Sequence, residues 1–438
     1  MFFKDIFAAA LLATQATATI YYAGVAESSG EFGVYTHDLL IWVGAGASKT
    51  VGTGLPGTFG VDYKFINESA IDVYVDQNHV NLFRVAFLLE RMCPVATGLG
   101  ASFNETHYGF FVDAINYITT TKGAYAILDP HNYMRYNDPS QQPSTGSIIG
   151  DTTDSKAATT AQFAEFWGEL AGRLKDNEKV IFGLNNEVLI QMQVKKYKKL
   201  ILQAPRHGHE SDPRQRPSSH KCHPSSRSKP AVGLPPLPRS KIEDAQLLTF
   251  PKSIIAPGNG YTGGHSWTQN YTGNSPASSA VLGNLTDPVN NTAFDIHEYL
   301  DSDFSGSHAN CSQSGPTNLA PLTAWLKTTG FKAMITEFGG SNSTGCAGYI
   351  TGLVNYMAQN EEYIGWTAWA AGPLWGSSSP CCGGGNAWGS LEPGSLAADG
   401  SPGFYATVWE KDVQPLVPVE LQWSGVSSVR GGNLTSRV

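Results

Sequence analysis

Charged side chains, cysteines and long apolar stretches are all scarce in this chain of 438 residues. Only 15% of the residues are charged, and a net charge of −8 argues against a nucleic-acid partner. Beyond the N-terminal segment, no stretch is long and apolar enough to cross a membrane, so no membrane partner is expected. The six cysteines include no CxxC pair, and the sequence predicts neither a metal site nor a cofactor.

Apolar and aromatic residues, by contrast, are plentiful. Hydrophobic residues make up 41% of the chain, which is enough for the buried core of a large globular protein. Length alone does not choose between one domain and three. Aromatic residues reach 11%, with ten tryptophans, and their flat apolar faces suit a sugar-binding cleft as well as a large core.

The first residues have the pattern of a secretory signal. Lys4 precedes the apolar run 6–13, and residues 16–18 have the small-x-small form of a cleavage site. This pattern predicts a signal peptide over residues 1–18, although Asp5 is unusual in one, and an ordinary first helix is the alternative. Secretion agrees with the even number of cysteines, which permits disulfides, and with eight Asn-x-Ser/Thr sequons. The sequons lie at Asn67, Asn104, Asn270, Asn284, Asn290, Asn310, Asn342 and Asn433.

Short apolar runs alternate with helical patterns along most of the chain. Eight runs have the composition of buried strands, and several stretches between them carry apolar residues at helical spacing. This alternation predicts an α/β fold, the (β/α)8 or TIM barrel, as a single catalytic domain. A doubly wound open sheet is the alternative, but no G-x-G-x-x-G opens a helix after the first strand. The expected strands are 21–25, 82–87, 124–129, the run from Val180, 253–256, 292–297, 333–337 and 364–369, and the expected helices are 110–120, 161–174, 319–329 and 349–359.

Polar side chains gather where these runs end. The run from Val180 stops at Asn186 and Glu187, and such a pair alone is typical of a helix cap or a loop. A barrel, however, brings the carboxyl ends of its strands to one face, so polar residues from separate strands should converge there. They are Arg84, His131, Asn186, Glu187, His297, Tyr299, Glu337 and Trp369.

Two carboxylates in this set indicate the chemistry. Glycoside hydrolysis needs one protonated carboxyl group for the leaving oxygen and one ionised carboxylate at the anomeric carbon. Glu187 and Glu337 follow different strands and can supply this pair. Asn186 can bond the sugar 2-hydroxyl, an interaction that strengthens in the transition state.

The other members of the set suit supporting roles. Arg84 and Tyr299 suit an ionised Glu337, because a nearby cation lowers the pKa of a carboxylate. His297 suits the protonated carboxyl group, and Trp369 offers an apolar platform for the sugar ring.

With these residues in place, the chain resembles glycoside hydrolase family 5, and within it the secreted fungal endo-β-1,4-glucanases. The resemblance covers about residues 20–187 and 250–413. It implies hydrolysis of internal β-1,4 bonds in cellulose and related β-glucans with retention, with Glu187 as acid/base and Glu337 as covalent nucleophile. It also assigns Arg84, His131, Asn186, His297, Tyr299 and Trp369 to the subsite where cleavage occurs. The matching stretches are 24–33 (GVAESSGEFG), 83–85 (FRV), 129–133 (DPHNY), 181–187 (IFGLNNE), 257–267 (PGNGYTGGHSW), 297–303 (HEYLDSD), 335–340 (ITEFGG) and 365–373 (GWTAWAAGP).

The resemblance also bears on the rest of the chain. It implies a disulfide between Cys311 and Cys346, and leaves the pairing of Cys93, Cys222 and the adjacent Cys381-Cys382 open. The catalytic domain is expected over 19–413, followed by a tail over 414–438. We expect an extracellular monomer without a cellulose-binding module, since no Cys-rich aromatic repeat with a linker flanks the barrel.

Residues 188–250, called the basic segment below, depart from this pattern. Twelve of the 29 Lys and Arg residues of the chain lie between Lys195 and Lys241, and the helix expected after the fourth strand is missing. The composition is typical of disorder. The segment is therefore interpreted as a solvated insertion, a polyanion-binding patch or, the favoured explanation, a faulty translation such as a retained intron or a frameshift. Its histidines and Cys222 lack a recognised metal-ligand spacing.

Other functions stay open at this point. A β-mannanase or a xyloglucanase would use the same carboxylates, because the loops of the cleft determine which sugar is bound. A catalytically impaired carbohydrate-binding barrel is a further alternative, because an altered chain after Glu187 could misplace that residue, and small misplacements are costly for catalysis.

Overall fold

The computed structural model describes residues 20–33, 55–136, 146–188, 254–270, 276–287, 291–375, 387–397, 399–419 and 421. The predicted signal peptide, the basic segment after Val188, Cys222, Cys381 and Cys382 lie outside these ranges. Within the described ranges, every helix is too short or too polar to span a bilayer.

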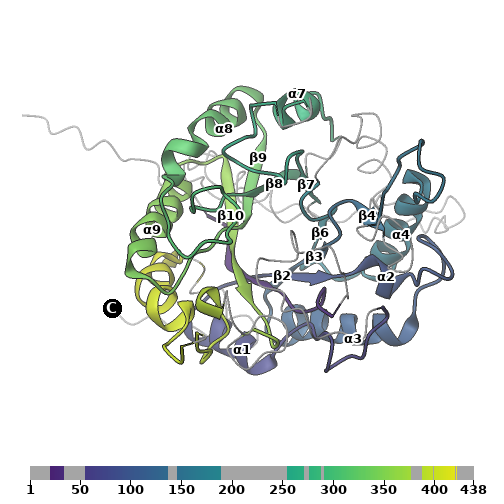
Figure 1. Ribbon diagram of the computed structural model, residues 1–438, viewed down its shortest axis with the longest axis horizontal. Coiled ribbons are helices and arrows are strands. Elements are labelled where there is room, and N and C mark those ends of the chain that lie inside the picture. Colours follow the sequence, from purple (N-terminus) through teal and green to yellow (C-terminus); the bar gives the residue numbers. More distant parts are fainter. Residues whose placement is uncertain are drawn as a thin grey trace, which may run out of the picture.

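Eight parallel strands close into a barrel, in the order β1-β10-β9-β8-β7-β6-β3-β2. Figure 1 shows the strands at the centre and the helices around them. Each strand coincides with one of the eight apolar runs, so the predicted (β/α)8 barrel is confirmed. The strands are β1 (Tyr22–Glu27), β2 (Leu82–Phe87), β3 (Tyr125–Pro130), β6 (Val180–Gly183), β7 (Ile254–Pro257), β8 (Thr292–His297), β9 (Lys332–Glu337) and β10 (Tyr363–Ala371).

The inside of the barrel is layered, because alternate residues of a strand face the same side. One apolar floor takes a single residue from each strand: Tyr22, Leu82, Ile127, Ile181, Ile255, Ala293, Met334 and Ile364. Two residues further toward the carboxyl ends of β2, β3, β8 and β9 stand Arg84, Asp129, Asp295 and Thr336, all buried. These four residues, called the polar layer below, lie between the apolar floor and the strand ends.

Helices cover the outside of the barrel. The longest are α3 (Glu105–Asn116), α4 (Thr160–Arg173), α8 (Gly315–Thr329) and α9 (Thr344–Ala358), and Figure 1 shows α8 and α9 side by side against the strands. Shorter helices are α1 (Glu68–Asp72), α2 (Leu89–Met92) and α7 (Ser278–Leu282), and β4 (Arg135–Tyr136) pairs antiparallel with β5 (Ser147–Ile148) in a separate two-stranded sheet. Three π-helical turns (Val73–Gln77, Tyr117–Thr121 and Tyr405–Val413) and two short 3-10 turns (Ala387–Gly389 and Gln414–Leu416) complete the described elements.

The helices begin earlier than their apolar spacing indicates. α8 starts at Gly315 rather than 319, because a proline occupies its first turn, where a missing N–H costs nothing. α9 starts at Thr344 rather than 349, because the Ser343 side chain accepts a bond from the backbone N–H of Gly345. The helix predicted over 110–120 begins at Glu105 and gives way to a π-helical turn at Tyr117.

Two features tie the outer parts together. Cys311 and Cys346 form a disulfide between the loop after β8 and α9, which is the pairing implied by the family resemblance. Cys93 is buried and free. Val417 and Leu421 belong to the main hydrophobic core, so the packed domain extends beyond the expected boundary at 413.

Candidate active site

Arg84, in the polar layer, is the centre of the site. Its side chain is 2% exposed and donates to Glu337 Oε1 at 2.5 Å and to Asn186 Oδ1 at 2.6 Å. The same guanidinium lies 3.1 Å from Asp129 Oδ2. A planar fork with five N–H donors can satisfy three acceptors at once, which an ammonium group does less well. Arg84 therefore links β2, β3, β9 and the residues after β6.

Glu337, the last residue of β9, receives a second donor besides Arg84. The Tyr299 hydroxyl, two residues beyond β8, donates to Glu337 Oε2 at 2.9 Å. Both donors favour the ionised form of a carboxylate. The geometry around Glu337 is therefore that of an anion held in a fixed orientation.

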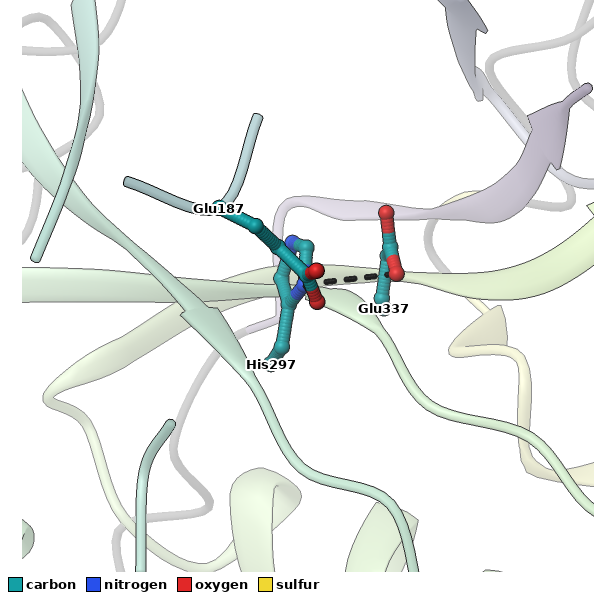
Figure 2. Close-up of side chains that lie close together, drawn as sticks. All are labelled: Glu187, His297 and Glu337. Atoms are coloured by element: carbon teal, nitrogen blue, oxygen red, sulfur yellow. Dashed lines mark hydrogen bonds and ion pairs between the residues drawn. The ribbon is translucent and has the colours of Figure 1, made fainter. Parts of the chain in front are cut away.

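Glu187 lies opposite, on the segment after β6, and has a different environment. His297 Nδ1 is 2.8 Å from Glu187 Oε1 and 3.2 Å from Glu337 Oε2. Figure 2 shows the two carboxylates reaching toward each other, with the imidazole beside Glu187. The backbone of Glu187 has φ of 36°, which a non-glycine residue adopts only at a cost, and such conformations concentrate at functional sites.

The distance between the two acids decides what chemistry they can share. One carboxylate oxygen from each and a nitrogen of His297 all lie within 4.8 Å of one another. This separation leaves room for a sugar carbon and its leaving oxygen, but not for an additional water between the two acids.

His131 and Trp369 form a wall next to Arg84. The two rings stack with centroids 5.1 Å apart, and the guanidinium of Arg84 lies 5.9 Å from the centroid of Trp369. His131 Nδ1 is 2.8 Å from Asp129 Oδ2, and the Asn186 amide nitrogen is 3.2 Å from His131 Nε2. All eight residues expected at the site therefore lie in one connected network.

Comparisons with known proteins agree with this geometry. The cellulase family (glycosyl hydrolase family 5) matches residues 43–209 and 249–374. The chain belongs to glycosyl hydrolase family 5. It is 58% identical to Endoglucanase 1 of Robillarda sp. (strain Y-20) over 435 residues, which are 99% of this chain and all of the relative.

More distant relatives agree on family and fold. A probable endo-beta-1,4-glucanase B of Aspergillus kawachii is 31% identical over 339 residues, 76% of this chain and 82% of the relative. The structure of XacCel5A in complex with cellopentaose matches 89% of this chain and 99% of its own, with a TM-score of 0.63 and 26% identity. The expected resemblance to family 5, the enzyme class and the barrel are thus confirmed.

Electrostatics separate the two acids of this family 5 site. Burial raises the pKa of Glu187 well above its usual range, and the neighbouring Glu337 charge raises it further. Burial also raises the pKa of Glu337, but Arg84 opposes that shift, as does the hydrogen bond from Tyr299. Burial lowers the pKa of His297 far below its ordinary value, and the charge of Arg84 adds to this, so the imidazole is neutral. These surroundings favour the proton on Glu187 over a proton on Glu337.

Sequence reasoning did not include three residues of the polar layer in the site. Asp129 holds both Arg84 and His131, while Asp295 accepts a hydrogen bond from the Thr336 hydroxyl. The signal that could have found them is the period of two, since each lies two residues after a residue of the apolar floor.

Two groups of described residues place possible metal ligands together. The first is Glu187, His297 and Glu337, already described. The second is Asp301, Asp303 and His308, in which the Asp301 carboxylate already accepts bonds from the backbone of Gly306 and from His308. Internal hydrogen bonds therefore account for the second group.

Proposed function

We propose that this family 5 chain is an endo-β-1,4-glucanase that hydrolyses internal bonds of cellulose and related β-glucans by double displacement, with Glu187 as acid/base and Glu337 as nucleophile. The single observation that carries the proposal is the approach of the two carboxylates to within 4.8 Å. Retaining glycosidases hold their carboxyl groups about 5–5.5 Å apart, whereas inverting ones need about 6.5–9.5 Å to admit a water.

The surroundings of each acid support its role. Glu337 accepts bonds from Arg84 and Tyr299, and an ionised, fixed carboxylate is what a nucleophile needs. Glu187 has the neutral His297 as neighbour and a raised pKa, so it carries a proton for the leaving oxygen. The pair thus has one anion and one acid at the same pH.

The reaction then follows in two steps. Glu337 attacks the anomeric carbon while the glycosidic bond breaks and the proton of Glu187 passes to the leaving oxygen. Glu187, now ionised, takes a proton from water as that water attacks the anomeric carbon and releases Glu337. The second step returns both residues to their starting states, and because each step inverts the anomeric carbon, the product keeps its configuration.

The substrate class rests on the relatives. The 58% identical relative is an endoglucanase, and the related structure holds cellopentaose, so a β-1,4-glucan chain is the proposed partner. β-Mannanase or xyloglucanase activity on the same scaffold is the second candidate, because family 5 carboxylates do not themselves select the sugar. We also propose that the enzyme is extracellular, in keeping with the N-terminal pattern and the sequons, and that it acts as a monomer.

The test uses reducing-end release from carboxymethyl cellulose, glucomannan and xyloglucan. Wild type should be most active on carboxymethyl cellulose, and proton NMR should show the β-anomer forming first. Glu337→Gln should abolish turnover, whereas Glu298→Gln is the matched control, because that buried carboxylate bonds His265 and Asn318 outside the network. No release from any glucan, or an active Glu337→Gln variant, would refute the proposal.

The basic segment bears on the proposal from outside the described residues. The family match is interrupted between 209 and 249, within this segment. Faulty translation therefore stays our interpretation, and the transcript across codons 188–250 is the measurement that checks it.

A further inference from the structure

Asp295 lies in the polar layer next to His297, the neighbour of the proposed acid/base. It is 3% exposed, and it stands two residues before His297 on β8, so both side chains face the barrel interior. Asp295 Oδ1 is 3.8 Å from His297 Nε2, while the other ring nitrogen faces Glu187 Oε1 at 2.8 Å. The imidazole thus stands between Asp295 on one side and Glu187 and Glu337 on the other.

The two nitrogens of His297 differ in how they are satisfied. His297 Nε2 is buried and has no hydrogen-bond partner within ordinary distance, whereas Nδ1 has two carboxylate neighbours. A buried polar atom without a partner is costly, and a neutral imidazole carries only one proton. The proton therefore resides on whichever ring nitrogen can donate it to a neighbouring acceptor while the other nitrogen accepts a hydrogen bond.

A proton on Nδ1 would lie between Glu187 Oε1 and Glu337 Oε2, and would leave a bare Nε2 facing the oxygen of Asp295. Glu337, however, already accepts hydrogen bonds from Arg84 and Tyr299. A proton on Nε2 instead points toward Asp295 Oδ1 and leaves Nδ1 free to accept the hydroxyl of a protonated Glu187. A separation of 3.8 Å is loose, but catalytic hydrogen bonds are often long without substrate and tighten in the complex.

Asp295 Oδ1 can accept from His297 in addition to its present partner. The Thr336 hydroxyl donates to this oxygen, and an ionised carboxylate oxygen has lone pairs for a second donor. Burial raises the pKa of Asp295 to about 7, against the opposing effects of Arg84 and of the Thr336 bond. Asp129 and Glu337 are the other charged groups that act on it.

We propose that Asp295 is a positioning residue that accepts a hydrogen bond from the Nε2–H of His297. This bond fixes the tautomer of His297 in which Nδ1 carries no proton and accepts a hydrogen bond from the protonated oxygen of Glu187. The inference rests on the proposed role of Glu187. In a catalytic triad, a carboxylate likewise orients an imidazole by a hydrogen bond, and the imidazole then acts on the reacting group. Asp295 itself touches neither substrate nor reacting atom.

The experiment compares two substrates within each variant. Dinitrophenyl β-cellobioside releases a stable anion and needs no acid, whereas cellotetraose needs a proton on its leaving oxygen. General acid catalysis contributes about 10²–10⁴-fold to the rate, so Asp295→Leu should lower kcat for cellotetraose by about tenfold or more and leave its KM little changed. For dinitrophenyl β-cellobioside, kcat/KM should change little. The ratio between substrates is independent of the fraction of folded enzyme.

Conservative and control variants keep the test decisive. Asp295→Asn keeps an acceptor oxygen and should restore most of the activity on cellotetraose, while Glu298→Gln should leave the substrate ratio at the wild-type value. Asp295→Ala replaces the leucine variant if the latter does not fold. Equal losses on both substrates, or an Asn variant as impaired as Leu, would overturn the proposal.

Glu187→Gln separates this inference from the function on which it rests. If that variant shows the leaving-group dependence and Asp295→Leu does not, only the role of Asp295 fails. If Glu187→Gln shows none, the acid/base assignment fails as well.

Discussion

Replacing Arg84 by methionine should affect both stability and the acid side of the pH profile. The guanidinium touches Glu337 at 2.5 Å and Asp129 at 3.1 Å and is almost fully buried. Unit charges about 4 Å apart interact by about 4 kcal/mol at an effective dielectric constant of about 20. Loss of one partner from a buried ion pair costs about 3–5 kcal/mol because the remaining charge stays buried without a partner, so the free energy of unfolding should fall by that amount.

The catalytic effect has a definite sign. Arg84 lowers the pKa of Glu337, so its removal should raise that pKa further. The nucleophile must be ionised, and the acid limb of kcat/KM against pH should therefore move to higher pH. kcat/KM is the right quantity, because its pH dependence reports the groups of the free enzyme.

Arg91→Met is the matched control. Arg91 is as buried as Arg84, but it donates to the backbone carbonyls of Gly30, Phe32 and Pro56. It should therefore lower the free energy of unfolding, measured by urea titration of tryptophan fluorescence, without moving the acid limb. An acid limb that stays in place in Arg84→Met, or moves equally in both variants, would refute the assigned role of Arg84.

Three further outcomes test the scaffold. Replacing Cys311 and Cys346 together by serine opens a loop with a separation of 35 residues, and should lower the free energy of unfolding in urea by about 4 kcal/mol; no change would contradict a formed bridge. Gly24→Ala should give little soluble protein on expression, because its Cβ would lie 1.7 Å from the carbonyl oxygen of Leu82, and a normal yield would contradict the strand packing. Burial lowers the pKa of His107 to about 3, below its unfolded value of 6.5, so the wild type loses stability as pH falls through that window, by up to about 5 kcal/mol. His107→Leu should flatten that acid-side decline in urea midpoints, and an unchanged slope would exclude His107 as its cause.

The strands and the site face were predictable because both follow from local patterns. A parallel strand covered on both faces leaves a short apolar run, and the first polar residues after it fall at the strand end. Arg84 was recognisable because a charge inside such a run needs a partner. The earlier starts of α8 and α9 depend on Pro316 and Ser343, which lie outside the apolar spacing.

The pairing within the site could not be predicted in the same way. Which carboxylate receives Arg84 depends on the closure of the barrel, which pairs β2 with β1 and so places β9 three strands away from β2 across the interior. The contact between Glu187 and His297 joins residues 110 positions apart. In the sequence, Asp295 resembles any polar residue in a strand. Its role is indicated only by the structure, in which the nearby Nε2 of His297 is buried without a hydrogen-bond partner.

The position of Glu187 is determined by the described chain on both of its sides. Before it, the Asn186 backbone N–H donates to Pro130 O at 2.9 Å, and the Asn186 side chain accepts from Arg84. After it, Val188 is fully buried, and its carbonyl accepts from the Tyr261 backbone N–H at 3.4 Å. The strained backbone of Glu187 is thus fixed by neighbours in β3 and after β7, whichever residues follow Val188. A departure from the family pattern beyond that point therefore leaves the determinants of the acid/base position in place, which favours an active enzyme over an impaired carbohydrate-binding barrel.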